Sequence, residues 1–305
     1  MNQSKFLLVL PLAAAAYLSG CGGGGSDAGG PPPQVSSFSA STARYSETLL
    51  ITLSGNNLDQ ALTLSSAACK NFARGTAAPF ISTATLAYYT CTVSGVGNQT
   101  IAVSGGGITA ATVPFSVATP EVTMLVNNGA GVSGTLVIAL RPQEAPLTVD
   151  NFLAYVKSGF YNNTVFHRHG RTAASTPFVL QGGGYAAPLL SATRFPLPKP
   201  TGTPIALEAG RGLSNLRYTL AMARTNELNS ATSEFFINTV DNAFLDTSGG
   251  GYAVFGTVTT GTTLVDAMVA APCNLSPLNF NDFPLISTDC LPEPNLVIVG
   301  ATQTR

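Results

Sequence analysis

A chain of 305 residues with a formal net charge of −1 and only 10% charged residues is long enough for two domains. This weak, balanced charge argues against a surface for nucleic acid or for anionic lipid. An apolar content of 45% argues against disorder, and 31 glycines and 20 prolines favour strands and turns over long helices.

Residues 1–20 predict a targeting signal peptide rather than part of the fold. Lys5 supplies a positive charge, and the apolar stretch from Phe6 to Leu18 is too short to span a bilayer comfortably. The stretch ends in Leu-Ser-Gly-Cys, which resembles the cleavage box of bacterial lipoproteins. The resemblance implies cleavage before Cys21, a lipid on Cys21, and, because Gly22 follows, attachment to the outer membrane facing the periplasm. An ordinary signal peptide followed by a chance cysteine is the alternative.

Two segments of different composition follow the signal peptide. Residues 21–34, CGGGGSDAGGPPPQ, predict a flexible linker with nothing to bury. From residue 35 to 118, short runs such as Leu49, Ile51 and Leu53 alternate with polar residues and are separated by turns. This spacing indicates a small β-sandwich, and the segment loosely resembles the Ig-like modules of bacterial surface lipoproteins. No catalytic pattern is visible in it, so we expect a spacer or docking module.

The four cysteines after Cys21 are consistent with an exported protein. They allow three pairings, and the nearest neighbours are Cys69 with Cys91 and Cys273 with Cys290. In an oxidising compartment we expect two local disulfides. Each would close a loop of about twenty residues and contribute about 3 kcal/mol. A metal site is the weaker alternative, because no Cys-x-x-Cys spacing and no nearby histidine exist.

Residues 119–305 predict a second domain with many strands and two helices. The spacing of Phe152, Tyr155 and Val156 indicates a helix over Thr148 to Lys157 with one buried face. From Thr219 to Asp246, two apolar runs flank a polar loop of small residues, as expected for two strands joined at the surface. The remaining elements are strands near residues 122–126, 136–140, 166–168, 178–184 and 252–256, a helix near 264–268, and a last strand over 296–299.

Six short motifs occur in order over about a hundred residues of this domain. They are FHR (166–168), FVLQGGG (178–184), LAMART (220–225), SATSEFFIN (230–238), FLD (244–246) and GYAVFGTV (251–258). Together they resemble the cyclophilin family of peptidyl-prolyl isomerases, especially its bacterial exported members, from about Glu121 to Met268. The resemblance implies a closed eight-stranded β-barrel capped by two helices, which is compatible with the strands and helices predicted above.

Rotation about an X–Pro bond faces a barrier of about 18–20 kcal/mol because the nitrogen lone pair is delocalised. The reaction breaks no bond and transfers no proton, so it needs no nucleophile, metal or cofactor. A catalyst must bind the twisted amide better than either planar form. The resemblance implies that Arg168 is the catalytic residue, because a guanidinium can donate to the nitrogen lone pair that twisting localises.

The resemblance also implies a set of substrate-binding residues. They are Phe178, Val179, Phe236 and Leu245 for the proline pocket, Gln181 for a polar contact to the substrate backbone, Ala223, Arg224 and Thr225 for a loop whose backbone binds the residues before proline, Phe244 and Tyr252 for the rim, and Glu234 for a further substrate contact.

Two departures from the family pattern put activity in question. Glu234 stands where the family usually has glutamine, and an ionised carboxylate cannot donate a hydrogen bond. It could also pair with Arg168. In addition, residues 169–177 form a connection about five residues longer than usual, which could keep Arg168 from meeting the pocket. A loss of 1.36 kcal/mol of transition-state stabilisation is tenfold in rate.

Other residues have simpler interpretations. His167 and His169 lack a third metal ligand, so we expect a packed His167, an exposed His169 and no metal. Phe235 and Phe236 should lie on opposite faces of a strand, so that one of them lines a pocket. Residues 271–288 carry Pro, Asn and Phe between Cys273 and Cys290 and predict a disulfide-closed extension before the last strand.

Three hypotheses remain. The first is a monomeric, lipid-anchored prolyl isomerase that acts on proline-containing polypeptides of the bacterial cell envelope and assists their folding. The second is a cyclophilin-like peptide-binding or assembly module with little turnover. The third is a purely structural two-domain surface lipoprotein.

Overall fold

A computed structural model describes residues 31–305 except residues 106–107, 109–110, 173, 175, 188–197, 272, 276–289 and 293–295, and only the backbone of residues 273–275 and 290–292. The chain divides into two compact units, Met1–Ala118 and Thr119–Arg305. Within the described residues, no helix is both long and apolar enough to cross a bilayer. Cys21 and the residues of the predicted signal peptide lie outside the described part of the chain.

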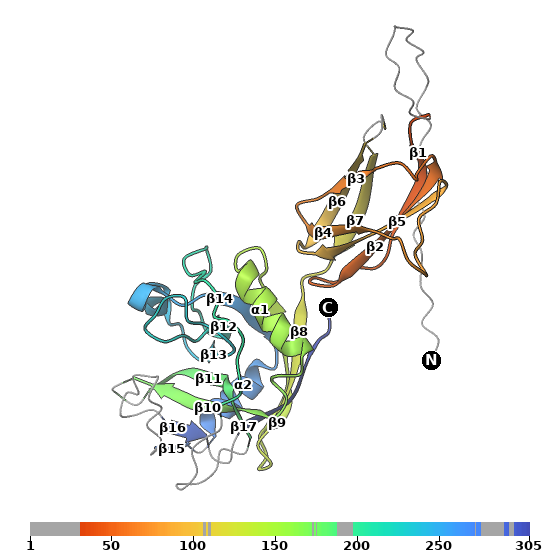
Figure 1. Cartoon of the computed structure of the whole chain (residues 1–305). Helices are drawn as coiled ribbons and strands as arrows, with labels where there is room; N and C mark the ends of the chain where they lie inside the picture. The colour runs from red at the N-terminus through yellow and green to blue at the C-terminus, as the bar shows by residue number, and fades with distance from the viewer. Residues whose placement is uncertain are drawn as a thin grey trace. The chain divides into compact units, whose positions relative to one another are not determined.

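The N-terminal unit contains two antiparallel sheets (Figure 1). The first has the strand order β1-β2-β5-β4, and the second β3-β6-β7. Their bounds are β1 Gln34–Ala40, β2 Thr48–Asn56, β3 Thr63–Ser65, β4 Cys69–Arg74, β5 Leu86–Val93, β6 Gly97–Ser104 and β7 Ala111–Val117.

Alternation of apolar and polar residues builds the core of this unit. In β2, Leu49, Ile51 and Leu53 are fully buried while their neighbours are partly exposed, as the side-chain period of two in a strand requires. Cys69 and Cys91 form a disulfide that joins β4 to β5, with the two Cα atoms 5.7 Å apart. The predicted pairing of these two cysteines is therefore confirmed.

The C-terminal unit contains a closed barrel of eight antiparallel strands, in the order β11-β13-β12-β14-β9-β8-β17-β10. Pairing of β10 with β11 joins the last strand to the first. The bounds are β8 Glu121–Asn127, β9 Ser133–Leu140, β10 Thr164–Arg171, β11 Pro177–Ala186, β12 Thr219–Met222, β13 Phe235–Asn238, β14 Val254–Thr260 and β17 Leu296–Gln303. The predicted mainly-β fold and closed eight-stranded barrel are confirmed.

Two helices pack against this barrel, α1 (Pro146–Lys157) and α2 (Thr262–Ala270), as predicted. The buried face of α1 places Phe152 against the rings of Tyr161, Phe235 and Phe255, at centroid distances of 5.2, 5.7 and 4.9 Å. This aromatic cluster fills the barrel next to α1. Two short 3-10 helices, η1 (Ala243–Asp246) and η2 (Ser248–Gly250), lie between β13 and β14.

The first turn of α1 obtains its capping group from a distant loop. The N-cap residue, Ala145, has no side chain that accepts a hydrogen bond. Instead, the buried carboxylate of Glu208 accepts from the backbone N–H of Thr148 (2.8 Å) and from its hydroxyl (2.9 Å). A carboxylate at a helix N-terminus satisfies unpaired N–H groups and opposes the positive end of the helix dipole.

Two further short strands extend the sheet beyond β10. β15 (Cys273–Leu275) pairs with β16 (Cys290–Pro292), and β16 pairs with β10 at His169. The predicted Cys273–Cys290 disulfide concerns side chains outside the described part of the structure. The prediction of an exposed His169 is wrong: the residue is fully buried, because β11 on one side and β16 on the other flank it.

Candidate active site

A small cleft of about 130 Å³ lies on the barrel unit. Its lining combines two arginines, one partly buried and one buried, with aromatic and aliphatic side chains and two amides. The lining residues are Arg168, Phe178, Val179, Gln181, Ala223, Arg224, Asn226, Phe236, Phe244, Leu245 and Tyr252.

Three neighbouring strands form one wall of this cleft, which we call the strand wall. Arg168 of β10 lies opposite Gln181 of β11, and Gln181 lies opposite Phe236 of β13. Residues in register on adjacent strands point to the same face of a sheet. Pairing therefore brings the guanidinium, the amide and the aromatic ring together, and it confirms that Phe236 and Phe235 have different environments.

The apolar part of the cleft is a continuous cluster. Phe236 and Leu245 pack with Val179, and the partly buried rings of Phe178 and Tyr252 lie against them. The rings of Phe236 and Tyr252 are 5.6 Å apart in an edge-to-face arrangement. Such a pocket buries an apolar ring and leaves room for only a small one.

A chain of hydrogen bonds connects Arg168 to residues behind the cleft. Arg168 Nη1 donates to Gln181 Oε1 (2.9 Å), and Gln181 Nε2 donates to Glu234 Oε2 (2.7 Å). His167 Nε2 lies 3.2 Å from the same carboxylate oxygen. Burial raises the pKa of Glu234, but attraction and hydrogen bonding from His167, with smaller effects of Gln181 and Arg168, bring that pKa below its usual value. Glu234 is therefore ionised at neutral pH.

The opposite wall, which we call the loop wall, consists of residues 223–226 and 242–252. Its centre is the buried guanidinium of Arg224, which donates to the carbonyl oxygens of Thr225 (2.9 Å), Gly249 and Gly251 (2.9 Å). The same guanidinium stacks on the ring of Tyr252 at 4.6 Å. Gly249 and Gly251 have φ values of +58° and +89°, which side-chain-bearing residues rarely adopt. With these positive φ values, the carbonyl groups of Gly249 and Gly251 both face the guanidinium of Arg224.

Hydrogen bonds of one carboxylate and three asparagines hold the loop wall in place. Asp246 accepts hydrogen bonds from the hydroxyl of Ser214 and from both the backbone and side-chain N–H of Asn215 (2.8 Å each). Partial burial raises the pKa of Asp246, but these hydrogen bonds bring it below its usual value. Asn242 Nδ2 donates to the carbonyl of Phe178 (2.7 Å) and to Asn238 Oδ1 (2.8 Å), which ties the loop wall to the strand wall.

The structure brings together Arg168 and most of the predicted substrate-binding residues. Thr225 and Glu234 are the exceptions, since they do not line the cleft. The Thr225 hydroxyl bonds to Ser230 (2.9 Å) and closes the loop, while Glu234 lies behind Gln181. Asn226 lines the cleft and was not predicted, because nothing in its sequence context distinguishes it from its neighbours.

The long connection after Arg168 does not separate it from the cleft. β10 continues to Arg171, which lies opposite Pro177, the first residue of β11. The pairing of Arg168 with Gln181 is preserved beside the cleft.

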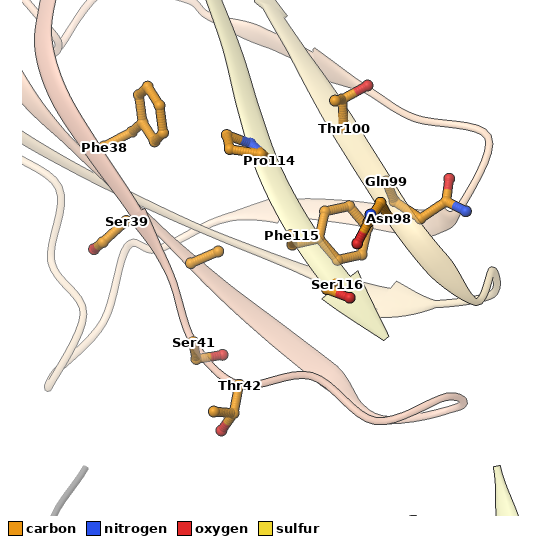
Figure 2. Close-up of a pocket in the computed structure, with 11 residues that line it drawn as sticks. Phe38, Ser39, Ser41, Thr42, Asn98, Gln99, Thr100, Pro114, Phe115 and Ser116 are labelled. Carbon is orange, nitrogen blue, oxygen red and sulfur yellow. The ribbon is translucent and has the colours of Figure 1, made fainter. Parts of the chain in front are cut away.

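A second and larger cavity, of about 570 Å³, belongs to the N-terminal unit (Figure 2). It lies among residues of β1, β6 and β7, including Phe38, Gln99 and Phe115. No residue that lines it carries a charge. It therefore lacks the cation that distinguishes the smaller cleft.

Comparisons with known proteins assign the class of this site. The family model described as "Cyclophilin type peptidyl-prolyl cis-trans isomerase/CLD" matches residues 122–285, more than half of the chain. The C-terminal unit is thus of the peptidyl-prolyl cis-trans isomerase class.

Individual relatives agree with this class. The chain is 48% identical over 141 residues to peptidyl-prolyl cis-trans isomerase cyp18 of Streptomyces antibioticus, covering 45% of this chain and 78% of the relative. It is 44% identical over 155 residues to peptidyl-prolyl cis-trans isomerase A of Dickeya dadantii (50% and 74%) and 46% identical over 138 residues to isomerase B of Escherichia coli (44% and 77%). A crystal structure of a Cryptosporidium parvum cyclophilin-type isomerase covers 61% of this chain and 98% of its own, with a TM-score of 0.44 and 22% identity. This protein belongs to the cyclophilin family.

Proposed function

We propose that Arg168 is the catalytic residue of a prolyl isomerase that acts on X–Pro bonds of cell-envelope proteins and assists their folding. The apolar cluster of Phe178, Val179, Phe236 and Leu245 holds the proline ring, while the preceding carbonyl group rotates. Backbone groups near Ala223 bind the residues before proline.

The chemistry requires a group that favours the twisted amide over both planar forms. In the planar amide the nitrogen lone pair is delocalised and accepts poorly, whereas in the twisted amide it becomes an acceptor. A guanidinium held beside the proline ring donates to that nitrogen only during rotation. The protein therefore needs to supply only a fixed cation and an apolar pocket for the proline ring.

The observation that carries this proposal is the convergence of one guanidinium with one apolar pocket. Arg168 lines the same small cleft as the ring-binding cluster. Its Nη1 atom donates a hydrogen bond to the side-chain oxygen of Gln181, so the orientation of the guanidinium is set before a substrate binds. Preorganisation of this kind lowers the cost of reaching the twisted state.

Replacing Arg168 with alanine tests the proposal. We expect kcat to fall by about 10²- to 10³-fold with little change in KM, as when a donor to a transition-state charge is removed. The assay is two-dimensional NMR exchange on a blocked Ala-Pro peptide. Arg168→Lys, which keeps the charge but not the planar fork, should recover only part of the rate. Equal rates for the wild type and Arg168→Ala would overturn the proposal, and binding without turnover in the wild type would favour a peptide-binding module.

For the location of the enzyme we propose a lipid on Cys21 and attachment to the outer membrane. The apolar stretch before Leu-Ser-Gly-Cys supports this proposal, and the Cys69–Cys91 disulfide is consistent with an oxidising compartment. Cys21→Ala should move the protein from the membrane fraction to the soluble fraction of the envelope. Retention of Cys21→Ala in the membrane fraction would contradict the lipid anchor.

For the N-terminal unit we propose an Ig-like module that acts as a spacer. Its two antiparallel sheets and alternating core support this assignment. Deleting residues 35–118 should leave kcat/KM toward a short peptide unchanged and should alter only activity toward large clients near the membrane. A large loss toward the short peptide would contradict the spacer role.

A further inference from the structure

Glu234 places a carboxylate directly behind Gln181. An ionised carboxylate accepts hydrogen bonds and donates none, whereas an amide does both. In this structure the Glu234 carboxylate accepts from Gln181 Nε2 at 2.7 Å. Because the amide nitrogen of Gln181 must face Glu234, the amide oxygen faces Arg168, from which it accepts at 2.9 Å. The donor-to-acceptor direction of both hydrogen bonds, from Arg168 to Gln181 and from Gln181 to Glu234, thus follows from the charge on Glu234.

The carboxylate is enclosed by residues from β10 and β11. Its side chain is 20% exposed, and the side chain of His167 beside it is 2% exposed. A Cβ atom added to Gly184 would lie only 2.3 Å from Glu234 Oε1, so the absence of a side chain at Gly184 makes room for the carboxylate. Carboxylate and imidazole therefore have defined positions behind the cleft.

Among the residues that the structure describes, three titratable or charged groups act on the carboxylate. His167 approaches within 3.2 Å, Arg168 attracts it from the same strand, and Tyr161 lies in the turn before β10. Burial raises the pKa of Tyr161 far above its usual range, and its hydroxyl donates to the carbonyl of Ser233 at 2.8 Å. Tyr161 therefore stays neutral, and His167 has the largest attractive effect on Glu234.

We propose that Glu234, which His167 of β10 contacts, is a positioning residue that orients the amide of Gln181 and thereby holds Arg168 for isomerisation. The inference rests on the catalytic role proposed for Arg168. It assigns a function to the carboxylate behind the cleft, and it makes His167 part of the same arrangement.

This arrangement should give the isomerase activity a distinctive dependence on pH. Burial alone favours the protonated acid, and the attraction of His167 opposes it. If the attraction of His167 is removed, the burial effect dominates and the pKa of Glu234 rises. A protonated acid has a hydroxyl that donates, so Gln181 is no longer required to present its oxygen to Arg168. Activity should then be lost in mild acid.

The test compares His167→Gln with the wild type, since a glutamine side chain places a neutral donor near the position of His167 Nε2. Between pH 7.5 and 5.5 we expect kcat of the wild type to change by less than about twofold, and kcat of His167→Gln to fall by about tenfold with KM unchanged. The double variant His167→Gln/Glu234→Gln should show no acid loss in this range. Glu227→Gln, an exposed carboxylate of the adjacent loop, is the matched control and should behave as the wild type does.

Two results would overturn the proposal. One is a His167→Gln profile that is lowered by the same factor at every pH, as a merely structural role predicts. The other is an acid loss that persists in the double variant. If His167→Gln does not fold, NMR of the wild type decides: the side-chain N–H signals of Gln181 should titrate with the carboxyl carbon of Glu234, and independent titration would overturn the proposal. Arg168→Ala distinguishes a failure of this proposal from a failure of the proposed catalytic role. Only full activity of Arg168→Ala would contradict the catalytic role of Arg168.

Discussion

The two walls of the cleft are held by different forces. In the strand wall, Arg168, Gln181 and Phe236 occupy registered positions on three paired strands. In the loop wall, residues 223–226 and 242–252 contain the short 3-10 helices η1 and η2 but no paired strand, and single side chains hold them. Arg224 binds three carbonyls, and Asp246 binds the segment at Asn215. The strand wall thus has many redundant backbone bonds, while the loop wall depends on a few polar groups.

This difference predicts how each wall responds when one of its side chains is removed. Removing one side chain from a paired strand leaves the backbone ladder in place, so the strand wall loses a function and keeps its shape. Removing a side chain that binds several backbone carbonyls leaves buried acceptors unsatisfied, at about 1–3 kcal/mol for each group. The loop wall should therefore lose its shape first, and substrate binding with it.

The largest expected effect in the loop wall comes from Arg224→Met. The carbonyls of Thr225, Gly249 and Gly251 lose their donor, and Tyr252 loses its stacking partner. We expect the free energy of unfolding to fall by about 3 kcal/mol and kcat/KM to fall by about tenfold to a hundredfold, chiefly through KM. Denaturant titration and NMR exchange measure the two effects.

The matched control for this prediction is Arg217→Met, which removes an arginine whose side chain is 49% exposed and paired with Asp266. An exposed ion pair contributes little to stability, so this variant should resemble the wild type. Equal losses in Arg217→Met and Arg224→Met would show that the backbone contacts of Arg224 do not hold the loop wall.

Asp246→Asn should have a smaller effect that depends on pH. The pKa of this carboxyl is lowered in the folded state, mainly by bonds from Ser214 and Asn215 after burial has raised it. A lowered folded pKa contributes stability above the unfolded pKa of about 3.9, and this contribution is lost as the pH falls through the folded value. The variant should be about 2 kcal/mol less stable at pH 7.

The pH series provides the check on this prediction. The difference in free energy of unfolding between the wild type and Asp246→Asn should be constant from pH 8 to 6 and should shrink below about pH 4. A difference that stays constant down to about pH 3 would mean that the charge on Asp246 does not carry the effect.

The same contrast explains what the sequence could predict. The order of the motifs and the family resemblance they carry were sufficient for the barrel and for placing Arg168 and Gln181 in one site, and apolar spacing was sufficient for both helices. The supports of the loop wall were not predicted, although Asp246 ends the FLD motif. Their partners lie in loops far away in the chain, and no local periodicity marks such contacts. His169 was wrongly expected to be exposed because β16, which flanks it, comes from a distant segment.

The smallest expected effect belongs to Phe244, at the rim of the loop wall. Its side chain is 56% exposed, and its ring lies 6.1 Å from that of Phe178. Since no buried polar group depends on it, Phe244→Ala should change the free energy of unfolding by less than about 0.5 kcal/mol. An exposed ring that contacts the substrate should still contribute about 0.5–1.5 kcal/mol, so KM should rise by about two- to tenfold with kcat unchanged. A fall in stability instead would make Phe244 a support of the loop wall, and the wall would then depend on apolar packing as well as on its polar groups.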